Sequence, residues 1–439
     1  MLKLVISLLI GLTLQWGNAS AAEPLGPDIV VGLVVGQFSV ELNASAPYEV
    51  LEVATGNRLV LPAGKTFISV KNKTLQVAGK AAIGDTIRII SPQGEGTVAV
   101  NRKHYRGQLV VVLSSDCKKL SVHNSLPLEE YLAGVVAKDI RPLWPEAAIK
   151  AQIIAARSLA LSKLGQAKNA EFDVRANEPE LVYGGITAEN SKINKILATT
   201  CGLALTYQGR PLVAFTHSSS GGYTENSENV VGLYWPYLRG VPDYDQEAPE
   251  YSWEKVLTAL QLEKSLTQAG YLIGKLESIG LSPLKAAPLA TTDRGISGRV
   301  KRIEFNGSQG KVVLEGIKFQ QLLQLKSTLF DVEIATPVPN FIEVPIIDRY
   351  GNEIGKKKIP VQAPKKEQPK FLEGFSDLRL VSGSAGEKLI FKGYGEGHGL
   401  GLSYWGARAM ALQAPASSSD YYETILLHYY AGAQVEKIY

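Results

Sequence analysis

The chain has 439 residues, of which 45% are hydrophobic, and a formal net charge of +4. This length is sufficient for two or three domains with a substantial hydrophobic core. The small charge, without a basic stripe that carries aromatic residues, argues against a nucleic-acid-binding protein. The two cysteines, Cys117 and Cys201, either pair in an oxidising compartment or remain as buried thiols.

The amino terminus has the pattern of a secretory signal peptide over residues 1–21. Lys3 supplies a positive charge, Leu4–Leu14 is apolar, and Ala19–Ala21 offers the small residues that a signal peptidase needs. The apolar stretch is shorter than the roughly 20 residues that a membrane-spanning helix requires. We expect cleavage after Ala21 and export to the periplasm, cell wall or extracellular space. An uncleaved membrane tether is the alternative.

Residues 22–104 are predicted to form a β-rich amino-terminal region. Runs rich in β-branched residues, such as Ile29–Val35, alternate with short polar or glycine turns, and this pattern continues through Gln108–Leu113. Helical periodicity is weak between these runs. The strands of this region are therefore expected to continue into the part of the chain that follows.

A long helix is predicted from Trp144 to Leu164. Pro145 suits the first helical turn, where its missing N–H has no partner to lose, and Glu146 complements the positive end of the helix. Alanine, isoleucine and leucine dominate the rest, so the helix is expected to be largely buried, with small residues that allow close packing on a sheet.

The sequence patterns that predict the remaining elements are less regular. Strands are expected at Leu203–Gln208 and Leu212–Thr216, and helices at Ser252–Leu262, Phe319–Leu325 and Tyr421–Tyr430. Prolines and lysines mark residues 337–370 as an extended insertion or loop.

Five segments, in this order, carry the residues suited to a functional site. They are NSLPLEEYLAGVVAKD (Asn124–Asp139), WPEAAIKAQIIAAR (Trp144–Arg157), HSSSGGYT (His217–Thr224), WPYL (Trp235–Leu238) and GHGLGLSYWGA (Gly397–Ala407), with Ile425, Leu426 and Tyr429–Gly432 behind the last. This ordered set closely resembles the SpoIID/LytB family, which comprises stage II sporulation protein D and the amidase enhancer. The resemblance extends over residues 105–439, interrupted by an insertion at about 250–385. It implies a mixed α/β (α+β) fold in which one long buried helix packs on a sheet.

The resemblance implies action on the glycan strands of peptidoglycan. Sporulation members are lytic transglycosylases that cleave strands already stripped of stem peptides, and amidase-enhancer members stimulate a cell-wall amidase. A transglycosylase needs one carboxyl group as acid and then base, because the sugar's own 6-hydroxyl closes a 1,6-anhydro ring. Asp139 matches the family's catalytic glutamate, with a reach shorter by about 1.5 Å. The alternative for Asp139 is a turn or capping residue.

No metal or other cofactor is expected. The sporulation members carry a metal-binding cluster of histidine and cysteine after the long helix, and the equivalent stretch here is Asp173–Gly184. Tyr183 matches the family, but Arg175 and Glu180 stand where cysteines would, so a tetrahedral zinc site lacks its ligands. An ion pair between Arg175 and Glu180 is expected to bridge this loop instead.

The serine-rich and glycine-rich segments are predicted to line a glycan cleft, where hydroxyl groups, imidazoles and closely approaching backbone suit a sugar. Turn residues and a buried tryptophan are the structural alternatives. A serine hydrolase would need a Gly-x-Ser-x-Gly elbow around Ser219 or Ser220, and the segment lacks it. The candidate substrate-binding residues are Lys150, Arg157, Tyr183, His217, Ser219, Ser220, Gly221, Thr224, His398, Gly399, Ser403 and Trp405. Two functions remain open: a transglycosylase, and a non-catalytic glycan-binding protein that stimulates a cell-wall amidase.

Overall fold

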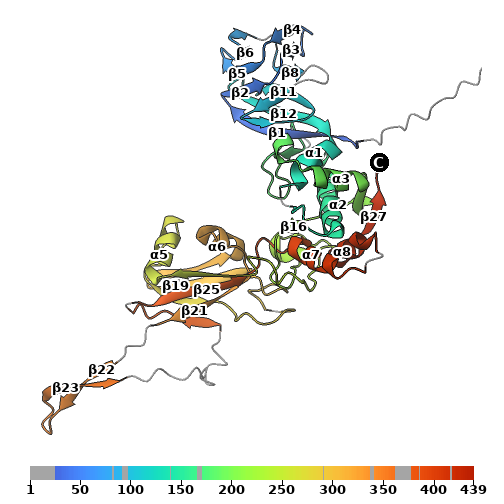
Figure 1. Cartoon of the computed structure of the whole chain (residues 1–439). Helices are drawn as coiled ribbons and strands as arrows, with labels where there is room; N and C mark the ends of the chain where they lie inside the picture. Colours follow the sequence, from blue (N-terminus) through green and yellow to red (C-terminus); the bar gives the residue numbers. More distant parts are fainter. Residues whose placement is uncertain are drawn as a thin grey trace, which may run out of the picture.

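The computed structural model describes residues 25–81, 84–90, 97–138, 140–165, 171–289, 291–336, 341–360, 377–384, 386–415 and 418–439. The predicted signal peptide and Asp139 lie outside these residues. The chain forms three parts in a bent row: an amino-terminal β part, a helical middle part and a third lobe, residues 252–394 (Figure 1). Within the described residues, no helix is long and apolar enough to cross a membrane.

The amino-terminal part consists of two antiparallel sheets, which confirms the predicted β-rich region. Its strands are β1 (Asp28–Gln37), β2 (Ser39–Ala44), β3 (Tyr48–Glu52), β4 (Arg58–Leu61), β5 (Gly64–Lys71), β6 (Thr74–Val77), β7 (Lys80–Ala81), β8 (Thr86–Ile90), β9 (Val98–Val100), β10 (Lys103–His104), β11 (Gln108–Leu113) and β12 (Leu120–Pro127). With β13 (Val174–Arg175), the described strands are ordered β13-β1-β12-β11-β8-β3-β4 and β10-β9-β2-β5-β6-β7. Buried and less buried residues alternate along β11, as expected for a strand with one face in the core.

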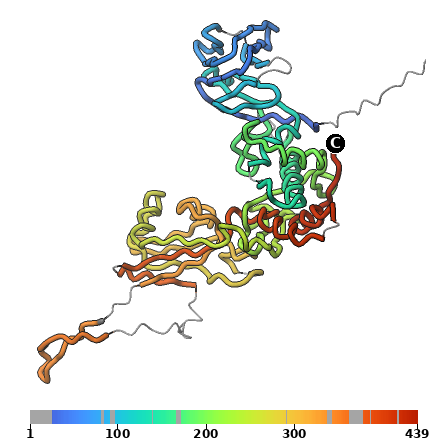
Figure 2. Tube along the Cα trace, in the orientation of Figure 1, coloured from blue at the N-terminus to red at the C-terminus, as the bar shows by residue number. Residues whose placement is uncertain are grey.

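The middle part is built around α2 (Glu146–Lys163), the long helix that the sequence predicted. The remaining elements are α1 (Leu128–Val136), a 3₁₀ turn (Ile186–Ala188), α3 (Ser191–Thr199), β14 (Leu203–Tyr207), β15 (Arg210–Pro211), β16 (Thr216–His217), α4 (Ser227–Val230), β26 (Leu402–Ser403), α7 (Tyr404–Leu412), α8 (Tyr421–Tyr429) and β27 (Gln434–Lys437). α2 packs against β14, α7 and α8. The carboxyl-terminal trace therefore returns to lie beside α2 (Figure 2). Together with the two sheets, this arrangement confirms the mixed α+β fold class.

The third lobe has its own hydrophobic core. It contains β17 (Ser252–Leu257), α5 (Ala259–Gln268), β18 (Leu276–Gly280), β19 (Arg302–Gly307), β20 (Gly310–Glu315), α6 (Gly316–Leu323), β21 (Phe330–Ala335), β24 (Leu378–Leu380) and β25 (Lys388–Tyr394). A hairpin of β22 (Phe341–Ile347) and β23 (Glu353–Pro360) projects from it, within the stretch expected to be extended (Figure 1).

Two predicted elements differ from the structure. The helix predicted at Ser252–Leu262 is wrong in its first half, because β17 pairs along its whole length with β25. The helix starts only after Thr258, whose side chain forms a capping box with Gln261. The strand predicted at Leu212–Thr216 is reduced to β16, since Phe215 N–H donates to Val213 O in a local turn.

Candidate functional site

Two of the predicted segments lie side by side at the centre of the site. β16 and β26 pair in parallel, with Thr216 opposite Leu402 and His217 opposite Ser403. This short ladder places residues 217–224, here called the serine loop, against residues 397–407, called the glycine loop. A further backbone bridge joins Ser219 to Glu396.

Two buried aspartates hold the serine loop. Ser219 Oγ donates to Asp245 Oδ2 at 2.5 Å, and Ser220 Oγ donates to Asp243 Oδ2. Tyr429 Oη donates to the other oxygen of Asp243 at 2.6 Å. Burial, and secondarily the charge of Asp245, raise the pKa of Asp243. Because both serine hydroxyls are buried and donate to carboxylates, neither is arranged as a nucleophile activated by a histidine.

The turn after these serines needs glycine. The N–H groups of Gly221 and Gly222 donate to Asp245 at 2.8 and 2.9 Å, and both glycines have a positive φ. A side chain at Gly221 would meet Tyr394 and Leu329 at 2.8 Å. Hydrogen bonds to the Asp245 carboxylate therefore hold this loop in place, instead of the backbone hydrogen bonds of a regular strand. Sequence reasoning missed Asp243 and Asp245; a signal was present in two acidic residues shortly after the WPYL segment.

A pair of histidines connects the two loops. Their rings lie 5.4 Å apart between centroids, and the Leu400 backbone bonds to both: its carbonyl lies 3.1 Å from His217 Nδ1 and its N–H donates to His398 Nδ1 at 2.9 Å. Both Nε2 atoms are shielded from solvent without a hydrogen-bond partner. Burial lowers the pKa of His217 well below its usual value, and burial together with the charge of Arg299 lowers the pKa of His398 to about 4. Both imidazoles are therefore neutral near pH 7. Since His398 Nδ1 accepts a hydrogen bond, its proton lies on Nε2.

Arg299 reaches this centre from the third lobe. Its Nη1 donates to Gly397 O at 2.9 Å and its Nη2 donates to Ser220 O at 3.1 Å. The side chain thus joins the serine loop to the glycine loop. Gly399 packs on the guanidinium so closely that a Cβ there would lie 2.3 Å from Arg299 Nε.

Trp405 links these loops to the segment around Asp139. Its backbone N–H donates to Ser218 O at 3.2 Å, and its ring lies 5.2 Å from that of Trp144 in an edge-to-face arrangement. The guanidinium of Arg141, two residues after Asp139 in the sequence, lies 5.0 Å from the Trp405 ring. Trp405 is half-buried, so part of its surface remains accessible.

Five candidate residues have polar groups engaged in holding the fold. Arg157 is fully buried and pairs with Glu129 at 2.7 Å, which gives it a structural role, because its guanidinium cannot reach a ligand. The remaining four make the following contacts: Tyr183 Oη donates to Asn124 Oδ1, Thr224 Oγ1 accepts from Val241 N–H, Ser403 Oγ accepts from Gly406 N–H at the start of α7, and Lys150 pairs with Glu146.

Two cavities adjoin the loops on the side of the third lobe. The first, of about 430 Å³, is lined by His398, Arg299, residues 228–232, 300, 301, 315–317, 320 and 328. The second, of about 390 Å³, lies at the Gly221–Gly222 turn and is lined by three tyrosines, Tyr223, Tyr251 and Tyr394, together with Lys285, Ser297 and apolar residues.

The stretch Asp173–Gly184, for which no zinc site is expected, contains no histidine or cysteine. Among the described residues, no group of three or more histidine, cysteine, aspartate or glutamate side chains is placed to hold a metal ion. The predicted ion pair between Arg175 and Glu180 is wrong: Arg175 lies over the ring of Phe172, 5.2 Å from its centroid. Glu178 instead pairs with Lys163 of α2 at 2.5 Å. No disulfide joins Cys117 and Cys201.

Part of the chain is similar to a known protein family. Residues 116–207 match the family model described as SpoIID, stage II sporulation protein. The chain is 34% identical to stage II sporulation protein D of Bacillus subtilis over 166 residues, which covers 33% of this chain and 47% of that protein. It is 26% identical to the amidase enhancer of Bacillus subtilis over 393 residues, which covers 87% of this chain and 51% of that protein. These alignments span about half the length of either relative.

A relative in Brachyspira hyodysenteriae aligns over nearly the whole chain. That uncharacterised protein is 24% identical over 402 residues, 90% of this chain and 89% of its own length. The alignment therefore includes much of the third lobe. Together these matches confirm the resemblance to the SpoIID/LytB family that the five segments indicated.

Proposed function

We propose that the protein is exported and acts on peptidoglycan as a lytic transglycosylase that cleaves stem-free glycan strands. One observation carries the proposal: Trp405 contacts both Arg141, close to Asp139 in sequence, and the serine loop. An accessible aromatic ring, a guanidinium close to Asp139 in sequence and the serine loop thereby lie in one region. Such a set suits a sugar, because aromatic rings pack on sugar faces while polar groups bond to hydroxyls.

In this mechanism Asp139 acts twice. Its carboxylic acid first donates a proton to the glycosidic oxygen as the bond from C1 to that oxygen breaks. The resulting carboxylate then accepts the proton of the sugar's 6-hydroxyl, whose oxygen forms the new bond to C1. The products are a 1,6-anhydro end and a free 4-hydroxyl, and no external water is consumed. Asp139 returns to its protonated state.

The rival function is a glycan-binding protein that stimulates a cell-wall amidase. It is favoured by the long alignment with the amidase enhancer, which covers 87% of this chain. Aspartate in place of the family's glutamate also favours it, because the shorter side chain changes the reach of the acid. Both functions require the region of the serine loop and the glycine loop to bind glycan.

The test is release of 1,6-anhydro sugar from stem-free strands by wild type, Asp139→Asn and Asp139→Glu. Loss of a general acid lowers the rate by roughly 10²–10⁴-fold, so Asp139→Asn should lose release while still binding strands. Asp139→Glu should retain activity. Asp116→Asn, the same change at an exposed turn, is the matched control. Undiminished release by Asp139→Asn removes Asp139 from the mechanism, and wild type without release leaves the amidase-stimulating function.

A further inference from the structure

The hairpin of β22 and β23 exposes many apolar side chains (Figure 1). From Ile342 to Pro360, every residue is exposed except Asp348 and Gly355, which are half-buried. The large apolar residues exposed there are Ile342, Val344, Ile346, Ile347, Tyr350, Ile354 and Ile359. A two-stranded hairpin is only marginally stable in water by itself, and a contiguous group of exposed apolar residues marks an interaction surface.

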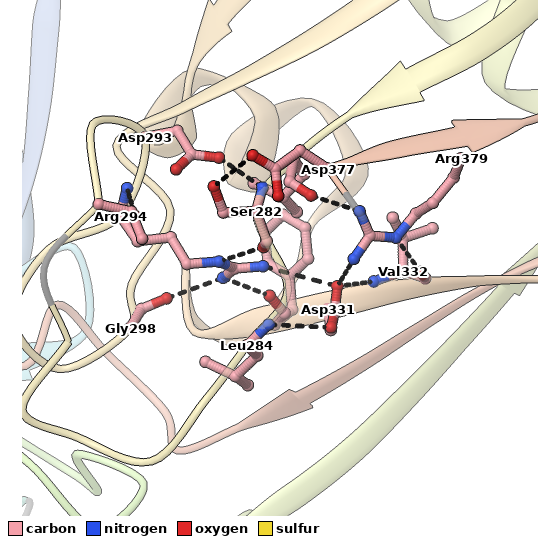
Figure 3. Close-up of polar contacts among 12 residues, drawn as sticks. Ser282, Leu284, Asp293, Arg294, Gly298, Asp331, Val332, Asp377 and Arg379 are labelled. Carbon is pink, nitrogen blue, oxygen red and sulfur yellow. Dashed lines mark hydrogen bonds and ion pairs between the residues drawn. The ribbon is translucent and has the colours of Figure 1, made fainter. Parts of the chain in front are cut away.

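The third lobe does not need this hairpin to close its own core. The hairpin is inserted between β21 and β24, and these two strands hold each other directly. Asp331 of β21 pairs with Arg379 of β24 at 2.5 Å, and Arg379 Nε donates to Val332 O at 2.6 Å (Figure 3). The hydrophobic cluster of the lobe contains no described residue of the hairpin. The isoleucines of the hairpin therefore serve a purpose other than filling this core.

The pairing register gives the hairpin two different faces. Residues directly opposite each other in an antiparallel pair share a face, and the faces alternate along each strand. One face, here called the apolar face, consists of the opposed pairs Ile342 with Ile359, Val344 with Lys357 and Ile346 with Gly355. On the other face Lys358 pairs with Glu343 at 3.7 Å, while Lys356 and Lys357 have no ion pair among the described residues.

The turn of the hairpin adds an aromatic ring and a cation. The Asp348 carboxylate accepts from the N–H groups of Tyr350 and Asn352 at 2.8 and 2.9 Å, so this acidic side chain is engaged in the turn. The Tyr350 side chain is 72% exposed, and the guanidinium of Arg349 lies 4.7 Å from its ring centroid. Tyrosine and arginine both suit the boundary between water and acyl chains, because each has an apolar body and a polar end.

The free edges of the hairpin disfavour pairing with another strand. Pro345 lies within β22 and has no N–H to donate, and β23 carries three successive lysines, Lys356–Lys358. A dissolved anionic polymer would engage the lysines but leave the apolar face in water. An anionic lipid surface suits both features, because its headgroups attract lysines and its acyl chains bury isoleucines.

We propose that this hairpin binds the surface of a lipid bilayer that contains anionic headgroups. The apolar face lies against the acyl chains, while Lys357 and the turn residues Arg349 and Tyr350 reach the headgroups. The hairpin thereby holds the protein at a membrane, and the middle part remains free to act. The inference does not depend on the glycan chemistry of the proposed function, so either can fail without the other.

The experiment measures co-sedimentation of the predicted mature chain, residues 22–439, with vesicles, so that the signal peptide does not itself bind lipid. The vesicles contain phosphatidylcholine alone, or phosphatidylcholine and phosphatidylglycerol in equal parts. We expect binding to the mixed vesicles. Ile342→Thr combined with Ile346→Thr should weaken it about tenfold or more, because two apolar side chains leave the acyl region. Lys356→Gln and Lys357→Gln should each weaken it by about fivefold.

The matched control combines Val256→Thr and Val313→Thr, at exposed strand positions elsewhere on the third lobe, and should bind as the unchanged protein does. Tyr350→Trp gives a second readout, since brominated acyl chains should quench the added fluorescence. Failure of the unchanged protein to sediment with either vesicle overturns the inference, as does undiminished binding by the threonine variant of the hairpin or an unquenched Tyr350→Trp. Lipid-free dimers that this threonine variant loses would identify a second copy of the chain as the occupant and would also overturn it.

Discussion

Position 406 requires glycine, because neighbouring side chains leave no room for a Cβ. A Cβ at this position would lie 1.8 Å from Asp243 Oδ1 and 2.2 Å from Tyr429 Oη. Any side chain must therefore displace the carboxylate that holds Ser220, and the serine loop with it. Glycine is therefore needed in the YWGA sequence because of its close contact with Asp243, a residue far away in the chain.

Gly406→Ala should destabilise the protein by about 1–3 kcal/mol, the usual range for overpacking. The same variant should weaken binding of stem-free strands, because the serine loop shifts. Urea unfolding and calorimetry measure the two effects. Gly355→Ala, where an added Cβ meets nothing within 4 Å, is the control and should change stability by less than about 0.5 kcal/mol. A fully stable Gly406→Ala protein would show that Asp243 moves freely.

His398 should make stability depend on pH. Its pKa is about 4 in the folded protein, lowered by burial and by Arg299, against 6.5 when unfolded. Below pH 6.5 the unfolded chain binds a proton that the folded chain does not, so stability falls as pH decreases towards 4. His217, whose pKa is lowered in part by His398, adds to the same slope.

Urea unfolding at several pH values between 4 and 7 measures this loss. Each unit of pKa difference corresponds to about 1.4 kcal/mol. His398→Gln should show a shallower decline than wild type over this range, while His104→Gln, a change at a half-buried histidine on β10, should not. Parallel curves for wild type and His398→Gln would contradict the assignment of a neutral buried imidazole.

At the scale of elements, α2 is anchored to α1 by the buried pair of Arg157 and Glu129. Arg157 Nε and Nη2 lie 2.7 and 2.9 Å from the two carboxylate oxygens. Glu129→Gln should cost about 3–5 kcal/mol, because it leaves a buried guanidinium without its counter-ion. Glu146→Gln removes the exposed pair with Lys150 and should cost less than about 1 kcal/mol. Similar losses in both variants, measured by urea unfolding, would disprove the special role of the buried pair.

The elements differ in how far the sequence predicts them. α2 is predicted to within two residues at either end because its signals are local: a proline next to the first turn and a continuous apolar run. β17 is missed because its partner, β25, lies more than a hundred residues further along the chain, and its alternating burial becomes meaningful only once they pair.

The candidate site shows the same difference between residues with a local sequence signal and residues defined by long-range contacts. The serine and glycine loops are found from their residue types, and the parallel pairing of β16 and β26 brings them together. Arg299 is missed because it lies in the insertion, outside any recognisable segment, and its partners are backbone carbonyls of distant loops. A lone arginine has no local pattern that distinguishes a buried cation from an exposed one.

At the scale of the whole molecule, fold and activity should be independent of metal. The stretch Asp173–Gly184 contains Arg175 and Glu180 but no cysteine or histidine, the usual ligands of structural zinc. Chelator treatment should leave the melting temperature and any glycan cleavage unchanged. A loss on chelation that zinc restores would show that ligands lie elsewhere in the chain.

The hydrophobic core around α2 is assembled from stretches that are synthesised far apart. Ala148 and Ile154 share one buried cluster with Leu402 and Ile425, whereas the core of the third lobe is drawn from residues 262–391 alone. At about 5–20 residues per second, the ribosome leaves the part of α2 that packs on α7 and α8 uncovered for about 10–50 s before those helices are made. The third lobe can close its core during that interval. A chaperone that meets the growing chain would therefore find its binding site on α2, and late truncations would expose that site permanently.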